Sequence, residues 1–181
     1  NGDIILPITA LQILYINIIT DGFPYIALTF EPGEKDVMKL KPRQKKAPIL
    51  NTEMKVLIFI MGIMTDLILF GIYFYMINHD FDVTYMRTFI FTALAVDSLF
   101  YVFSVKSLRK TIFHINIFSN RYLLIAVAAA FCLQLAAIYT PFMREVLELT
   151  ALSLTDWIWI IGFGLINVLF IELGKYIFIF K

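Results

Sequence analysis

The chain has 181 residues, of which 60% are hydrophobic, and its mean hydropathy is +0.82. An ordinary soluble domain is about 45–50% apolar, so this composition favours a membrane protein. The formal net charge is only +1, and the one cysteine, Cys132, excludes both an intrachain disulfide and a cysteine metal cluster. The chain starts at Asn1 without Met and without a basic leader and cleavage site, so we expect it to be a fragment of a longer protein.

The apolar residues fall in five blocks of about 20 residues, the length that crosses a hydrocarbon layer of about 30 Å. The predicted spans are residues 9–28, 56–77, 88–105, 122–139 and 157–178. Tyr and Trp gather toward the ends of these blocks, as in the interfacial belts of membrane proteins, which argues against five buried helices of a large soluble protein. The predicted fold is an all-α, polytopic membrane helical bundle with about five transmembrane helices and with membrane lipid as a partner.

The first span carries the sequence Asn17-Ile18-Ile19-Thr20-Asp21-Gly22-Phe23-Pro24. A carboxylate at bilayer depth costs roughly 2.5–3.5 kcal/mol on translocon-insertion scales, so Asp21 is expected to have a partner or a ligand. In an α-helix Asn17, Thr20 and Asp21 lie at i, i+3 and i+4, which places their oxygens on one face. The glycine and proline that follow favour a helix break with freed backbone carbonyls, as in membrane ion sites. Residues 1–30 are therefore predicted to form an outer loop and a span with a cation site.

Loop charges predict the orientation of the spans. Residues 31–55 hold seven basic and four acidic residues, a net charge of +3, and residues 106–121 hold four basic and no acidic residues. Cytoplasmic loops carry an excess of Lys and Arg, so these two loops are predicted to be cytoplasmic. The loops on the opposite side are both net negative. With an odd number of spans, the N-terminus is expected outside and the C-terminus inside.

The loop of residues 31–55 is predicted to be an ordered or semi-ordered strap. Pro32, Pro42 and Pro48 restrict its backbone, and its charges leave too few apolar residues for a core. Two interpretations stay open: a solvated linker that satisfies the positive-inside rule, or a strap that docks against a neighbouring cytoplasmic element. Residues 56–181 are predicted to add four further helices to the same transmembrane domain.

Several polar residues interrupt the later spans. Asp66 lies among Met, Ile and Leu with no basic residue nearby in its own helix, so it is a possible cation-binding or near-site residue. A role in a proton or counter-ion pathway competes with a structural one. Glu172 is expected to pair with Lys175 at i+3. Gln134 and Asn167 are expected to form interhelical hydrogen bonds.

Two groups of short segments carry a family resemblance. The first group comprises Leu6-Pro7, residues 11–24, Ala27-Leu28, Glu31-Pro32, residues 36–39 and Pro42-Arg43. The second comprises Arg87-Thr88, Phe91-Thr92, residues 103–107, Asn120-Arg121, Leu133-Gln134, residues 138–141, Asp156-Trp157 and residues 172–175. The first group resembles the sixth transmembrane helix and following loop of P-type cation-transporting ATPases, most closely the calcium-type branch, and the second resembles their eighth to tenth helices. The resemblance implies that the chain is the C-terminal transmembrane region, helices six to ten, of such a pump.

The resemblance also implies a partial ion site. In calcium-type pumps the positions that match Asn17, Thr20 and Asp21 supply side-chain oxygens to the transported cation, so calcium is the expected ion. Calcium takes six to eight oxygen ligands, and one helix cannot supply them all. The resemblance places the missing ligands on the fourth and fifth helices of the pump, outside this chain.

The third span offers a further candidate for this site. Aligning Lys106-Ser107 with the end of the eighth helix places Ser98 where some relatives have an acidic ligand, and Asp97 stands one residue earlier. One residue turns a helical side chain by about 100 degrees. Asp97 is therefore either a ligand or near-site charge, or a carboxylate that serves helix packing or a water cavity.

Catalytic motifs are absent from the chain. It has no Asp-Lys-Thr-Gly-Thr phosphorylation sequence, no Gly-rich phosphate loop and no promising Ser/His/Asp arrangement, so it is not expected to hydrolyse ATP by itself. The resemblance implies that ATP and magnesium bind to cytoplasmic domains of the parent pump, which with its remaining helices are the expected partners; no nucleic-acid partner is expected.

An alternative is a non-catalytic membrane scaffold or regulatory helical bundle without ion transport, in which the intramembrane polar groups serve packing alone. An independent secondary transporter is disfavoured by the odd span count and the lack of an internal repeat.

Overall fold

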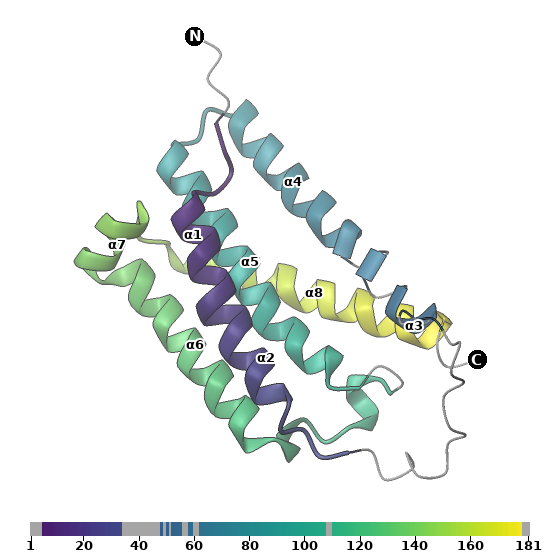
Figure 1. Cartoon of the computed structure of the whole chain (residues 1–181). Helices are drawn as coiled ribbons and strands as arrows, with labels where there is room; N and C mark the ends of the chain where they lie inside the picture. The colour runs from purple at the N-terminus through teal and green to yellow at the C-terminus, as the bar shows by residue number, and fades with distance from the viewer. Residues whose placement is uncertain are drawn as a thin grey trace.

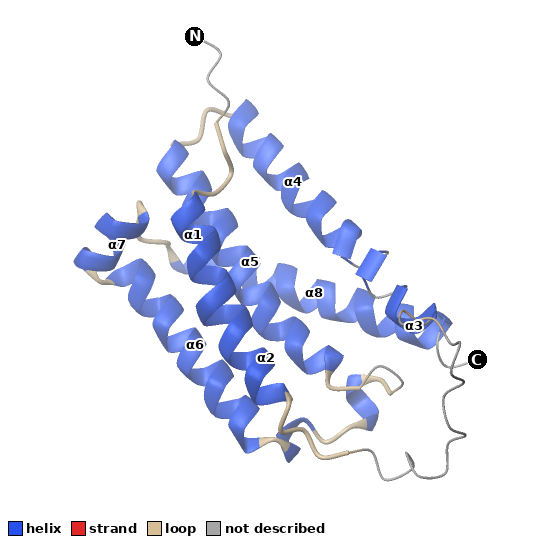
Figure 2. Ribbon diagram, in the orientation of Figure 1, coloured by secondary structure: helices blue, strands red, loops and turns tan. Residues whose placement is uncertain are grey.

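The structure, a computed structural model, describes residues 5–33, 48, 50, 52–55, 58–59, 62–107 and 110–178. Within these ranges every regular element is a helix (Figure 1 and Figure 2). Four of the described helices are long and apolar enough to cross a membrane, and α4 (Gly62–Asn78) is apolar but shorter. The predicted all-α bundle is confirmed, and the first residues of the predicted span 56–77 are only partly described.

The observed helices follow the predicted blocks closely. The remaining membrane helices are α1–η1–α2 (Ala10–Leu28), α5 (Val83–Val105), α6 (Arg121–Tyr139) and α8 (Leu154–Phe178). Shorter helices are α3 (Thr52–Lys55), η4 (Ile112–His114), η5 (Ile117–Ser119) and α7 (Pro141–Leu147). α5 begins before the predicted residue 88 because the Asp82 carboxylate caps it, accepting the Tyr85 N–H at 3.0 Å.

The first membrane helix is continuous but contains a π-helical stretch. α1 (Ala10–Tyr15) leads into the π-helical η1 (Ile16–Gly22), and α2 (Phe23–Leu28) follows directly. Pro24 accounts for the wider turn, because its ring would clash with the carbonyl of residue 20 in a regular α-helix and its nitrogen has no hydrogen to donate. The predicted helix break is therefore wrong: the chain accommodates Pro24 by widening the helix.

α5 lies at the centre of the bundle, in contact with α4, α6, α8 and η1 (Figure 1). Its span is 56% buried, against at most 39% in the other three long spans. Each of three apolar clusters contains residues of α5, namely Ala93 and Val96, Phe91 and Ala95, and Val102. Small residues let helix backbones approach closely in membranes, which suits a helix with neighbours on several sides.

α5 and α8 pack closely at one glycine. A Cβ atom added to Gly164 would lie 2.7 Å from Cδ2 of Phe100, so the aromatic ring packs directly against the backbone of α8. Gly162, two residues earlier on α8, has nothing within 4 Å of such an atom. The close approach is thus local to Gly164.

One end of the bundle gathers the loops predicted to be extracellular. Arg87, at the start of α5, donates through Nε to the Leu6 carbonyl at 3.1 Å and lies 3.5 Å from Glu148. Tyr73, near the end of α4, donates its hydroxyl to the Ile5 carbonyl. The N-terminal residues, the α4–α5 loop and the α7 region therefore meet at this end.

The opposite end gathers the loops predicted to be cytoplasmic. Lys106 Nζ lies 3.3 Å from Glu31 Oε1 and donates to Ser119 Oγ at 2.9 Å. The start of the predicted strap and the loop after α5 thus lie together, as the charges predict. The assignment of this end to the cytoplasm stays a prediction, and residues 34–47 of the strap lie outside the described residues.

Candidate functional site

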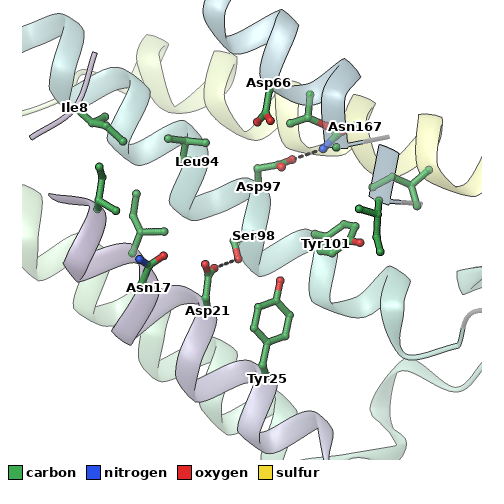
Figure 3. Close-up of a pocket in the computed structure, with 16 residues that line it drawn as sticks. Ile8, Asn17, Asp21, Tyr25, Asp66, Leu94, Asp97, Ser98, Tyr101 and Asn167 are labelled. Atoms are coloured by element: carbon green, nitrogen blue, oxygen red, sulfur yellow. Dashed lines mark hydrogen bonds between the residues drawn. The ribbon is translucent and has the colours of Figure 1, made fainter. Parts of the chain in front are cut away.

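A cavity of about 470 Å³ lies between the first membrane helix, α4, α5 and α8 (Figure 3). Its polar lining consists of Asn17, Asp21, Tyr25, Thr65, Asp66, Asp97, Ser98, Tyr101 and Asn167. Five of the six residues predicted for the cation site line it, and Thr20 does not. Polar side chains from four helices therefore converge on one cavity whose remaining lining is apolar.

Asp21 has the partner that its position in a membrane span requires. Ser98 Oγ donates a hydrogen bond to Asp21 Oδ1, which joins η1 to α5 (Figure 3). Asn17 lies one turn before Asp21 and lines the same wall of the cavity. The helix widening keeps these two side chains together, because residues at i and i+4 remain neighbours in a π turn.

Thr20 is placed differently from the prediction. Its side chain is fully buried, and its hydroxyl donates to the Ile16 carbonyl at 3.0 Å. A π turn holds more residues than an α turn, so side chains at i and i+3 diverge more widely than in an α-helix. The expectation that Asn17, Thr20 and Asp21 share one face fails for Thr20 for this reason.

Asp97 faces a different neighbour from Ser98, although both line the cavity. Asn167 Nδ2, on α8, donates to Asp97 Oδ1 at 2.6 Å, and Thr65 Oγ1, on α4, donates to Asn167 Oδ1 at 2.8 Å. The expected turn of about 100 degrees between consecutive residues thus sends Ser98 toward η1 and Asp97 toward α8. The interhelical hydrogen bond predicted for Asn167 is confirmed.

Three carboxylates share the cavity. Asp66, on α4, is exposed to it and close enough to interact electrostatically with Asp97, while Asp21 lies on the wall opposite α4 (Figure 3). Like charges in one partly buried space disfavour each other, and a bound cation relieves that repulsion. Among the described residues, however, no three His, Cys, Asp or Glu side chains lie close enough together to hold a metal ion.

The sequence-based prediction missed four polar residues of the lining: Tyr25, Thr65, Tyr101 and, as a site residue, Asn167. The tyrosines stand four residues after Asp21 and Asp97, the spacing that shares a helical face, so that signal was present in the sequence. Thr65 precedes Asp66 directly, and only the packing of α4 against α8 brings it to Asn167.

A buried ion pair lies outside the cavity at the far end of α8. Lys175 Nζ is 2.9 Å from Glu172 Oε1 and also donates to the Ser104 carbonyl, while Glu172 Oε2 accepts the Ile112 N–H at 2.7 Å. Both side chains are almost fully buried. The predicted pair at i+3 is confirmed. Its additional hydrogen bonds satisfy polar atoms of the two side chains that would otherwise be buried without partners, at a cost in folding free energy.

The interhelical hydrogen bond predicted for Gln134 is not found among the described residues. Its side chain is fully buried in α6, and neither Nε2 nor Oε1 has a hydrogen-bond partner among the described residues. Its neighbours one turn away on the same face, Ala130 and Ala137, are also fully buried and apolar. Packing therefore placed this amide where no described group reaches it.

The model of a known family matches nearly the whole chain. The model of the family described as "Cation transporting ATPase, C-terminus" matches residues 5–177. The chain belongs to this family. Together with the four apolar helices, membership makes the chain part of an integral, multi-pass membrane protein.

Similarity to individual cation-transporting ATPases supports the assignment of the chain to this family. The chain is 35% identical over 165 residues to a calcium-transporting ATPase of Bacillus subtilis, a match that covers 89% of this chain and 18% of that protein. It is 29% identical over 185 residues to calcium-transporting ATPase 1 of Bacillus cereus, covering 93% and 21%. It is 31% identical over 156 residues to human calcium-transporting ATPase type 2C member 1, covering 86% and 17%. The chain thus spans about a fifth of the length of these relatives.

Proposed function

We propose that this chain is the C-terminal membrane domain of an ATP-driven P-type pump, and that it supplies part of the intramembrane site for a transported cation, calcium. The observation that carries the proposal is the cavity in which Asn17 and Asp21 of η1 meet polar groups of α4, α5 and α8. The names of the relatives, calcium-transporting ATPases, support the choice of ion. Calcium binds carboxylate and amide oxygens, which this lining provides.

We assign Asn17 and Asp21 as the ligands from the first membrane helix. Thr20 enters the proposal from the family resemblance alone, since its hydroxyl now donates to the Ile16 carbonyl. Relaxation of η1 to a regular α-helix would turn Thr20 back toward the face of Asn17 and Asp21. Asp97 and Asp66 are proposed as near-site charges. The remaining ligands would come from other helices of the parent pump.

Transport would proceed by alternating access. ATP and magnesium would act in cytoplasmic domains of the parent pump, and phosphorylation there would shift the membrane helices and change the geometry around Asp21. The strap of residues 31–55 is the proposed contact with those domains. Its first residue, Glu31, is tied by Lys106 to the loop after α5, which supports a mechanical link from the strap to the helix that carries Asp97 and Ser98.

The proposal is tested by Asp21→Asn in the full-length pump. Removing the charge while keeping the shape should abolish calcium-dependent phosphorylation from ATP, because the residue at position 21 loses most of its attraction for a divalent cation. The matched control is Asp80→Asn, which makes the same change in the α4–α5 turn outside the cavity and should leave phosphorylation unchanged. Normal calcium-dependent phosphorylation of the Asp21 variant would favour the scaffold alternative.

A further inference from the structure

Asn167 joins three helices through a single amide group. It lies on α8 with 6% of its side chain exposed, accepts the Thr65 hydroxyl of α4 on Oδ1, and donates from Nδ2 to Asp97 of α5. Thr65 is also buried, at 8% exposure. We call this set of three residues the amide relay. It spans the side of the cavity opposite η1 (Figure 3).

Only one orientation of the Asn167 amide satisfies the hydrogen bonds of all three residues of the relay. A carboxylate accepts hydrogen bonds and cannot donate them, so the amide must turn its NH₂ group toward Asp97. The amide oxygen then points to Thr65, whose hydroxyl can donate to it. Without that donor, the oxygen would be left unpaired in a buried place, and the orientation of the amide would lose its support.

The relay acts on one oxygen of Asp97. Nδ2 of Asn167 engages Oδ1, and this contact leaves Oδ2 able to face the cavity. Asp97 precedes Ser98, which donates to Asp21 on η1. α5 therefore carries two adjacent contacts in opposite directions, one to the proposed ligand Asp21 and one to the relay.

We propose that Asn167 is a positioning residue for the cation site, aimed by Thr65, and that the amide relay holds the Asp97 carboxylate in the direction from which it assists cation binding. This proposal rests on the proposed function. The relay makes cation affinity depend on the packing of α4 and α8 against α5, although neither α4 nor α8 carries Asn17 or Asp21. Asn167 itself need not touch the ion.

The first test replaces Thr65 by Val in the full-length pump, which keeps the shape and removes the hydroxyl. The half-saturating calcium concentration for phosphorylation should rise about three- to tenfold, the effect of one lost hydrogen bond, with an unchanged maximal level. Thr65→Ser, which restores the hydroxyl, should return the wild-type value. Thr92→Val is the matched control: Thr92 is buried on α5, but its hydroxyl donates to the Thr88 carbonyl within its own helix.

The second test is a double-mutant cycle with Asn167→Leu, which removes both hydrogen bonds of the amide. This variant should raise the half-saturating concentration at least as much as Thr65→Val, and adding Thr65→Val to it should cause a smaller rise than in the wild-type background, because the Thr65 hydroxyl reaches Asp97 through Asn167. Independent, additive effects would overturn the relay. So would a wild-type calcium response of Thr65→Val, or equal shifts for its Val and Ser variants.

These outcomes are separate from those of the proposed function. If Asp21→Asn abolishes the calcium response while the relay variants keep wild-type affinity, the cation site stands and the relay is rejected. If Asp21→Asn keeps the calcium response, the site itself is rejected, and with it the relay. A variant with lowered thermal stability and unchanged calcium affinity would show that Asn167 serves packing alone.

Discussion

The residue that contributes most to the interpretation is Asp21, a carboxylate held in an apolar span. The sequence predicted that it needs a partner, and the partner is the hydroxyl of Ser98. The family resemblance placed Ser98 at the site, but its hydrogen bond to Asp21 could not be read from the sequence, because it depends on how α5 packs against η1. The position of Thr20 was unpredictable for a related reason: the standard helical spacing does not apply in a π turn.

Substitution of two buried glutamines, Gln134 and Gln12, is expected to change stability in opposite directions. Both are fully buried, but Gln134 has no partner among the described residues. Gln12 instead accepts the Thr9 N–H at 3.0 Å and donates to the Leu147 carbonyl at 2.8 Å. Replacing an unpaired buried amide by Leu removes an unfavourable group and orphans nothing, so Gln134→Leu should raise the free energy of unfolding by up to about 1–3 kcal/mol.

The measurement is the thermal unfolding midpoint of the full-length pump in detergent. Gln134→Leu should unfold at the same or a higher temperature than the wild type. Gln12→Leu, the matched control, should unfold at a lower temperature because it leaves the Thr9 N–H and the Leu147 carbonyl without their partner. A clear loss of stability in the Gln134 variant would show that its amide has a partner beyond the described residues.

At the scale of elements, the sequence was reliable about which segments are helices. Blocks of apolar residues predicted the long helices, since their length and composition are set by the bilayer. The internal form of the first helix was not predicted: Gly22 and Pro24 indicated a break, and the helix widened instead. Both outcomes relieve the clash of proline with the preceding turn, and the sequence alone does not choose between them.

The α5–α8 crossing gives a prediction at this scale. Gly164→Ala would place a Cβ atom 2.7 Å from a ring carbon of Phe100, so the helices or the ring must shift. We expect a loss of about 1–3 kcal/mol in the free energy of unfolding, typical of overpacking. Gly162→Ala, on the same helix but with open space at its Cβ position, should have little effect. Thermal unfolding of the two variants side by side makes the comparison, and equal stabilities would refute the packing argument.

At the scale of the whole molecule, the charge pattern predicted which loops share an end, and the structure groups them in that way. The sequence did not predict a full set of ligands for the proposed cation. The described residues supply a cavity with three carboxylates but no complete metal cluster. The proposed coordination shell includes ligands from other helices of the pump, and the chain spans about one fifth of the relatives' length, so its sequence predicts only its own share of the site.

The predicted orientation can be tested with two exposed phenylalanines. Phe118, in η5, and Phe142, in α7, are each 73% exposed. η5 contacts Lys106 at one end of the bundle, and the residue after α7, Glu148, contacts Arg87 at the other. In a cysteine-free background of the full-length pump, Phe118→Cys should react with an impermeant thiol reagent only from the cytoplasmic side, and Phe142→Cys only from the other side. Reaction from the reversed sides would invert the topology.

The central claim is that the cavity at η1 binds the transported cation, and equilibrium binding of radioactive calcium to the purified full-length pump tests it most directly. The account predicts saturable binding in the wild type and in Asp80→Asn, and a loss of bound calcium in Asp21→Asn. An Asp21→Asn pump that binds as much calcium, with the same affinity, as the wild type would contradict it.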